Sequence, residues 1–289
     1  MGWANDIDKS NFSLILGGTS HNIISSSHSM IGAGESLNIF DSVNSAILSG
    51  RYTSIRYSKE SSIVSVAASY SAESPSGIYH SSGSFLGGGS SHQIISSSNS
   101  VIVGGQANKI KDRSNSSGVI GGVRQYISGS KYSFMATGYG NIILDSDYSV
   151  VLTQANSIIS QPALRGSNYS MIGTGYYSEI SGSDYSAIMV GRSSEILGSE
   201  YSFMGTGNTS LISGSNYSSI MNGYANKIYH DSGPDGMGSG NTFHNTIVGG
   251  EDNIIRNNYI SGSDSGSYFR YNFIGNGKDN HIMSSIPTG

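Results

Sequence analysis

The chain has 289 residues, including 40 glycines, 4 prolines and no cysteine, and its formal net charge is −4 at pH 7. The missing cysteines exclude a disulfide framework and a thiolate zinc site, and the absence of a basic stripe argues against nucleic-acid binding. Apolar residues keep a strict register, which separates the chain from a disordered Gly/Ser linker, and no run approaches the roughly 18 apolar residues of a membrane span.

Residues 1–12 are expected to form an N-terminal lead-in. They contain no apolar segment of the kind that a secretory signal carries. We therefore expect either a protein assembled in the cytosol or a fragment from which export signals have been removed.

A repeat begins at Ser13. The pattern Ser-x-[Ile/Val/Leu/Met]-x-x-Gly, with an Ile ten positions after the Ser, recurs about every sixteen residues. A unit this short cannot bury its own apolar face and must stack on its neighbours, so the repeat predicts one β-solenoid domain over 13–283 and a tail at 284–289. The fifteen copies, the last two degenerate, start at Ser13, Ser29, Ser45, Ser61, Ser84, Ser100, Ser117, Ser133, Ser149, Ser170, Ser186, Ser202, Ser218, Asn245 and Asn272.

Each copy predicts two short strands joined by turns. No stretch has helical spacing, and glycine and serine at this density disfavour helix. We expect an all-β fold, a parallel β-roll or β-solenoid of about fifteen coils, in which alternate side chains of each strand face inward. The inward positions are Ile15, Ile31, Ile47, Ile102, Ile172, Ile188 and Ile220 in the first strand, and Ile23, Ile39, Ile94, Ile110, Ile180, Ile196 and Ile228 in the second.

The outward residues of the two strands differ. Those of the first strand are apolar and compensate in volume, with glycine two positions after a large residue, as in Met30/Gly32 and Phe203/Gly205. A strand that is apolar on both faces is typical of burial on both faces, which favours an intertwined or side-by-side homotrimer over a wide monomeric solenoid. The second strand carries residues that suit water, namely Asn38, Lys109, Lys111, Glu179, Glu195 and Lys227.

Copies such as 100–110 (Ser-Val-Ile-Val-Gly-Gly-Gln-Ala-Asn-Lys-Ile) and 202–207 (Ser-Phe-Met-Gly-Thr-Gly) resemble the head repeats of trimeric autotransporter adhesins. Similar repeats occur in bacteriophage tail fibres, and the resemblance covers roughly residues 13–283. It implies a trimeric, left-handed parallel β-roll with a role in attachment. The period of sixteen is longer than that of the typical adhesin head, and neither a coiled-coil stalk nor a signal peptide is visible. These departures favour a phage-like tail fibre, located on a virion tail or an extracellular surface.

A tyrosine precedes the starting serine in six consecutive copies. Stacking of the coils would align these side chains at one corner. Two interpretations remain open: a corner spine held by ring stacking, or an aromatic strip that binds a ligand. The six residues are Tyr132, Tyr148, Tyr169, Tyr185, Tyr201 and Tyr217.

Four insertions interrupt the period, at 72–83, 160–169, 229–244 and 256–271. They are expected between the second strand and the next repeat start, where they would map to one edge of the solenoid, often the binding edge. Loops without a ligand are the alternative. The last two insertions contain the mixture of aromatic, Arg, Asp and His residues expected of a receptor site: Tyr229, His230, Asp231, Phe243, His244, Arg256, Tyr259, Tyr268, Phe269 and Arg270.

Catalysis and metal binding have little support in the sequence. The carboxylates Asp231, Asp235, Glu251 and Asp264 do not select the pair that glycoside hydrolysis requires, and His230, Asp231 and His244 are scattered metal ligands. We expect no enzyme and no cofactor or metal. The expected function is a fibre that binds a cell-surface glycan or protein without inserting into the membrane. An ice-binding or ice-nucleating solenoid, a bacterial surface adhesin and a polysaccharide depolymerase are the alternatives.

Overall fold

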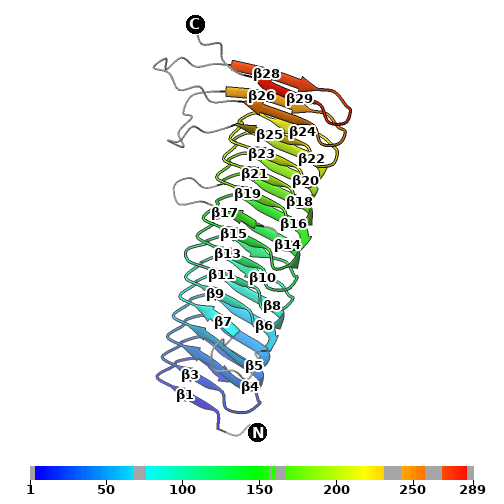
Figure 1. Ribbon diagram of the computed structural model, residues 1–289. Helices are drawn as coiled ribbons and strands as arrows, with labels where there is room; N and C mark the ends of the chain where they lie inside the picture. Colours follow the sequence, from blue (N-terminus) through cyan, green and yellow to red (C-terminus); the bar gives the residue numbers. More distant parts are fainter. Residues whose placement is uncertain are drawn as a thin grey trace. The chain divides into compact units, whose positions relative to one another are not determined.

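The computed structural model describes residues 4–67, 76–155, 158–160, 167–230, 242–257 and 269–284. All regular elements in these residues are β-strands, and the chain divides into two compact units, Met1–Ile143 (unit 1) and Leu144–Gly289 (unit 2). In each unit the strands lie one above the next in a parallel β-solenoid (Figure 1). The predicted fold class is therefore confirmed.

The strands form two ladders, called here the first-strand ladder and the second-strand ladder after their order in each repeat. In unit 1 the first-strand ladder consists of β2 (Leu14–Ile15), β4 (Met30–Phe40), β5 (Ala46–Arg56), β6 (Ser62–Ala67), β8 (Phe85–Ser90), β10 (Val101–Ile102), β12 (Gly118–Val119) and β14 (Phe134–Tyr139). The second-strand ladder of unit 1 consists of β1 (Asp6–Asp8), β3 (Asn22–Ile24), the C-terminal parts of β4 and β5, β7 (Ser76–Tyr79), β9 (Gln93–Ile95), β11 (Lys109–Lys111) and β13 (Tyr126–Ser128).

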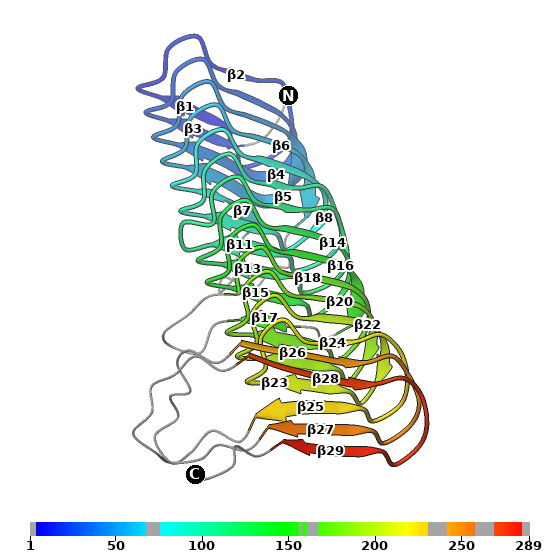
Figure 2. The same ribbon diagram turned by 90° about the horizontal axis from the view of Figure 1, so that it is seen from above.

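The strand β15 (Ile142–Leu144) spans the boundary, and unit 2 repeats the same plan. Its first-strand ladder consists of β16 (Val150–Ala155), β18 (Met171–Tyr176), β20 (Ala187–Arg192), β22 (Phe203–Asn208), β24 (Ser219–Ile220), β26 (Thr242–Ile247) and β28 (Phe269–Ile274). Its second-strand ladder, whose last strands lie side by side in Figure 2, consists of β17 (Ile158–Ser160), β19 (Glu179–Ser181), β21 (Glu195–Leu197), β23 (Leu211–Ser213), β25 (Lys227–His230), β27 (Ile254–Asn257) and β29 (His281–Ser284).

Aliphatic side chains fill the interior of each unit. The Ile ten residues after each starting Ser pairs in register with its counterpart in the next turn, for example Ile180 with Ile196 and Ile196 with Ile212. Wherever burial is described, these isoleucines after the starting serines are fully buried, as are the predicted inward isoleucines of the first strand apart from the half-buried Ile15 in the first turn. The predicted inward faces are therefore confirmed.

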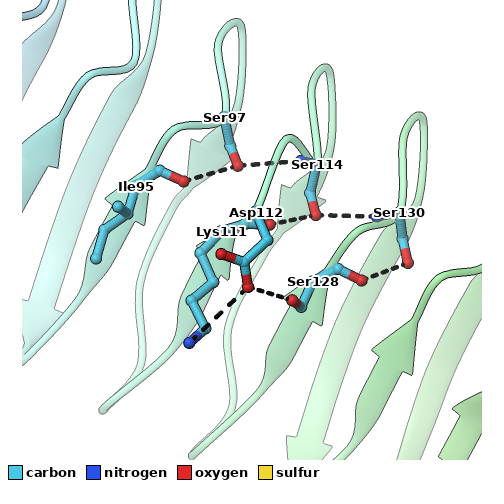
Figure 3. Close-up of polar contacts among 7 residues, drawn as sticks. All are labelled: Ile95, Ser97, Lys111, Asp112, Ser114, Ser128 and Ser130. Atoms are coloured by element: carbon cyan, nitrogen blue, oxygen red, sulfur yellow. Dashed lines mark hydrogen bonds and ion pairs between the residues drawn. The ribbon is translucent and has the colours of Figure 1, made fainter.

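Buried serines hold one corner of the coil together. Ser114 Oγ accepts a hydrogen bond from the Ser130 N–H at 3.0 Å and donates to the Lys111 carbonyl oxygen at 2.6 Å (Figure 3). Ser97 Oγ in turn accepts from the Ser114 N–H at 3.1 Å. The starting serines form a second such column, as Ser117 N–H donating to Ser100 Oγ at 3.3 Å illustrates. Each hydroxyl satisfies a backbone N–H that the turn leaves without a ladder partner.

The glycines two positions after a large outward residue have a reason within the chain. A Cβ on Gly32 would lie 2.1 Å from the Leu48 carbonyl oxygen of the following turn. A Cβ on Gly205 would lie 2.4 Å from the Met221 carbonyl oxygen and 3.4 Å from the Phe203 ring. The volume compensation thus reflects close approach of backbone and ring inside one chain, and it does not by itself require a partner chain.

The first insertion is placed differently from the prediction. Strand β7 lies inside the predicted insertion 72–83, and its Ile78 pairs with Ile55 and Ile94 of the second-strand ladder. The extra residues of this copy therefore precede the second strand. The error arose because the spacing rule places the expected Ile at residue 71, whereas the insertion displaces it to residue 78. The other three predicted insertions begin within the last residues of the second strands β17, β25 and β27, and the last two predicted insertions end within β26 and β28.

Candidate functional site

The structure describes only part of the predicted receptor site. Asp231, Tyr259 and Tyr268 lie outside the described residues. For Phe243, Phe269 and Arg270 only the strand positions are described, in β26 and β28, with Phe243 in register with Arg270. Side chains are described for Tyr229, His230, His244 and Arg256, and these four separate into two places.

Tyr229 and Arg256 lie together on the second-strand ladder of unit 2. They are Cα partners in β25 and β27, and the Arg256 guanidinium lies over the Tyr229 ring at 5.8 Å from its centroid. His230 follows Tyr229 in β25 and is half-buried. This arrangement is a cation–π pair of the kind that stabilises a surface or presents a ring and a cation to a ligand.

His244 instead belongs to a stack of aromatic rings, called here the aromatic ladder, that runs through unit 2. The rings of Tyr148, Tyr169, Tyr185, Tyr201 and Tyr217 stack in order with centroids 4.8–4.9 Å apart and interplanar angles of 1–4°. His244 continues the stack at 5.0 Å from Tyr217, and Tyr271 follows at 4.8 Å from His244. The predicted alignment of tyrosines is thus confirmed in unit 2, and it extends across the last two insertions. The positions of His244 and Tyr271 in the ladder could have been predicted from the sequence, because these two residues directly precede the repeat starts Asn245 and Asn272.

The geometry of this aromatic ladder, Tyr148 to Tyr271, limits what it can bind. Parallel rings at this spacing cover one another's faces, while the five tyrosines from Tyr148 to Tyr217 remain 44–50% exposed. Their edges and hydroxyl groups therefore face the solvent. Each of these five tyrosines precedes a starting serine, and all five have φ between 53° and 56°. The turn therefore fixes the direction of the ring, and stacking stabilises the corner.

The ladder should make unit 2 sensitive to alkaline pH. Burial, the neighbours Tyr217 and Tyr185, and the carboxylates Glu200 and Asp184 raise the pKa of Tyr201 above its ordinary value of 10.0. Because the folded pKa is raised, this contribution to stability is complete below pH 10 and is lost as the pH rises through the folded pKa.

We expect the thermal unfolding midpoint of the wild type to decrease as the pH rises above 10. The midpoint of Tyr201→Phe, which keeps the ring but cannot ionise, should decrease less steeply. Circular dichroism melts from pH 8 to 11.5 measure this difference. Identical pH profiles for the two proteins would show that the Tyr201 hydroxyl does not contribute.

Apolar side chains lie exposed along the first-strand ladder. In unit 1 the outward side chains Leu48, Val64, Val103 and Ile120 are 37–48% exposed. In unit 2 the corresponding side chains are 37–45% exposed: Leu152, Met189, Met221 and Val248. A repeated apolar row of this kind is unusual on a monomer surface and is typical of an interaction site.

The outward side chains of the second-strand ladder are mostly polar, as predicted. Glu179 and Glu195 are Cα partners in β19 and β21, and burial, followed by the charge of Glu195, raises the pKa of Glu179. Lys111 lies 5.2 Å from the Tyr126 ring centroid. This face is half-exposed, and it carries charges that suit water.

A hollow in unit 1 was not anticipated from the sequence. It is an open depression of about 360 Å³ against the second-strand ladder, lined by Asn22, Ile24, Asn38, Ile39, Phe40, Arg56 and Tyr57. The sequence feature that could have indicated this hollow is the third position of the second strand, which is occupied in consecutive turns by Ile24, Phe40 and Arg56.

Among the described residues no group of three His, Cys, Asp or Glu side chains could hold a metal ion. In the same part of the chain no helix is long and apolar enough to cross a membrane. Comparison with known families and with curated proteins finds no family model and no curated protein that matches this sequence.

Proposed function

We propose that the chain is a fibre protein that associates as a parallel homotrimer and attaches to a receptor on a cell surface. The observation that carries the proposal is the exposed apolar row of the first-strand ladder, opposite in character to the polar second-strand face. Burial of such a row against other copies removes apolar area from water at every turn.

Identical chains favour closed symmetry. Because the outward residues recur once per turn, parallel chains in register would bring each layer against the same layer of its neighbours. Three chains around one axis bury the first-strand face and leave the second-strand face and the insertions exposed. The resemblance of the repeats to adhesin heads and phage tail fibres supports the same arrangement.

Replacement of Phe203 by Asp should abolish trimer formation. Phe203 is a half-buried outward residue of β22, and burying three carboxylates near an axis costs several kcal/mol each. Native mass spectrometry at micromolar concentration should give a trimer for the wild type and a monomer for the variant. Leu211→Asp is the matched control, because Leu211 is equally half-buried but lies on the second-strand ladder, and it should leave the trimer intact. A monomeric wild type would refute the proposal.

Attachment is tested on the C-terminal insertions. Shortening 231–241 and 258–268 to tight turns keeps β25 to β29 and should abolish binding of fluorescently labelled protein to its target cells. The trimer mass should be unchanged, because the shortening removes no residue of a first-strand ladder strand. Undiminished attachment by the doubly shortened protein would place the receptor site elsewhere.

A second candidate, an ice-binding or ice-nucleating solenoid, has one observation in its favour. The aromatic ladder presents phenol groups at a regular spacing of about 5 Å along unit 2. Thermal hysteresis or freezing above the buffer control would support this candidate, and its absence would remove it.

A further inference from the structure

The hollow in unit 1 offers three kinds of contact within one small space. It lies on the outer face of the second-strand ladder, over β3 and the C-terminal parts of β4 and β5. Its volume of about 360 Å³ lies at the lower end of the range for small-molecule sites. Strand β3 contributes Asn22 and Ile24, β4 contributes Asn38, Phe40 and the buried Ile39 between them, and β5 contributes Arg56, which Tyr57 follows directly after the strand.

One wall is apolar and aromatic. Ile24 and Phe40 are Cα partners, and the Phe40 ring meets the Tyr57 ring edge to face at 5.6 Å and 82°. His80 stacks on Tyr57 at 4.7 Å and 9°, which holds the tyrosine ring in place. A ligand with an apolar face can therefore pack against a wall whose rings are already oriented.

The second element is a pair of amides. Asn22 Nδ2 donates to Asn38 Oδ1 at 2.8 Å, and this bond fixes both side chains. Among the described residues no donor reaches Asn22 Oδ1, and the Asn38 Nδ2 group makes only one long hydrogen bond, 3.4 Å, to the Ser36 carbonyl oxygen, so the pair that lines the hollow keeps hydrogen-bonding capacity. Adjacent amide donors and acceptors suit neighbouring hydroxyl groups.

The third element is a cation. Among the described residues no carboxylate lies within ion-pair distance of the Arg56 guanidinium. Arg51 in the same strand differs, because its Nε lies 3.0 Å from Glu35 Oε2. The register neighbours of Arg56 are Phe40 and Tyr79, and the Tyr79 ring packs over Gly77, where a Cβ would lie 2.8 Å from the tyrosine hydroxyl. Within the described residues Arg56 is thus a cation without a carboxylate partner, and its register neighbours are aromatic.

We propose that this hollow binds one acidic sugar residue, a pyranose that carries a carboxylate, within a surface polysaccharide. The Arg56 guanidinium takes the carboxylate in a two-point hydrogen bond, Asn22 and Asn38 take ring hydroxyls, and Phe40 packs against the apolar face of the ring. The inference rests on the proposed attachment function and adds a ligand class and a site in unit 1, distinct from the C-terminal insertions, which belong to unit 2. The site faces away from the first-strand ladder, so trimer formation would leave it open.

Titration of the full chain tests the proposal. The probes are the acidic sugars glucuronate, galacturonate and N-acetylneuraminate, the neutral sugars glucose and galactose, and acetate as a carboxylate without a ring. Binding is measured by calorimetry and by saturation-transfer NMR. At least one acidic sugar should bind with a Kd below about 10 mM, and its neutral counterpart and acetate should bind about tenfold more weakly or not at all. Affinity should fall with added salt.

Variants locate the site. Arg56→Gln and Phe40→Ala should each weaken binding of the acidic sugar about tenfold, and Arg56→Lys should be intermediate because it keeps the charge but loses the two-point geometry. Arg51→Gln is the matched control on the same strand with the same change of charge, and it should leave affinity unchanged. Thermal midpoints equal to that of the wild type establish that the variants are folded. If Arg56→Gln does not fold, the comparison is made with Arg56→Lys instead.

Three results would overturn the proposal. The first is that no acidic sugar binds, and the second is that acidic and neutral sugars bind equally well. The third is that acetate binds as tightly as the acidic sugars and that Phe40→Ala does not change the affinity. The last result would indicate a carboxylate site for a peptide or small anion. Failure here with cell attachment intact leaves the proposed function standing. Sugar binding by a protein that does not attach to cells would contradict the attachment function alone.

Discussion

Ile180→Ala should lower the free energy of unfolding by about 2–5 kcal/mol per chain. Ile180 is fully buried in β19 and pairs in register with Ile196. The neighbouring turns are held at about 4.8 Å by backbone hydrogen bonds, so the backbone cannot move in to fill the cavity. Urea denaturation followed by circular dichroism measures the change, at one fixed protein concentration because association also contributes to apparent stability.

The control for this experiment is Ser181→Ala in the same strand. Ser181 is half-buried and faces outward, so its truncation should change stability by less than about 0.5 kcal/mol. An unchanged midpoint for Ile180→Ala, or a larger effect for Ser181→Ala, would mean that the two faces of the second strand had been assigned in reverse.

Gly32→Ala is expected to be a strongly destabilising single-methyl addition on the first-strand ladder. The new Cβ would lie 2.1 Å from the Leu48 carbonyl oxygen, and this obstacle is backbone rather than the end of a flexible side chain. Relief requires that β4 and β5 separate locally, which strains the ladder hydrogen bonds between them. Overpacking of this kind costs about 1–3 kcal/mol and occasionally more.

Gly17→Ala is the matched control, because a Cβ at Gly17 would meet no atom within 4 Å. Both substitutions are to be compared by thermal and urea unfolding. Only Gly32→Ala should shift the midpoint downward. Equal midpoints would show that the first-strand ladder yields at this position, and the glycine would then have to be explained by association between chains.

The aromatic ladder shows that the position of a residue within the repeat predicts where its side chain lies. The ladder of tyrosines from Tyr148 to Tyr217 followed from position alone, because every copy sets the residue before the starting serine at the same corner. His244 and Tyr271 obey the same rule, yet the insertions that precede them drew attention to loop chemistry instead. Regular position in the repeat was a better guide to these two side chains than residue type.

The sequence by itself determined the all-β solenoid, the two buried aliphatic ladders and the aromatic column, because each follows from a period that returns the same residue to the same position in every turn. Tertiary structure decided what depends on contacts between turns. It placed Tyr79 over Gly77, moved the first insertion ahead of β7, and gave Gly32 its close contact with Leu48. It also brought Phe40, Arg56 and the Asn22–Asn38 pair around one hollow, since side-chain direction and the shape between neighbouring turns are not encoded in the period.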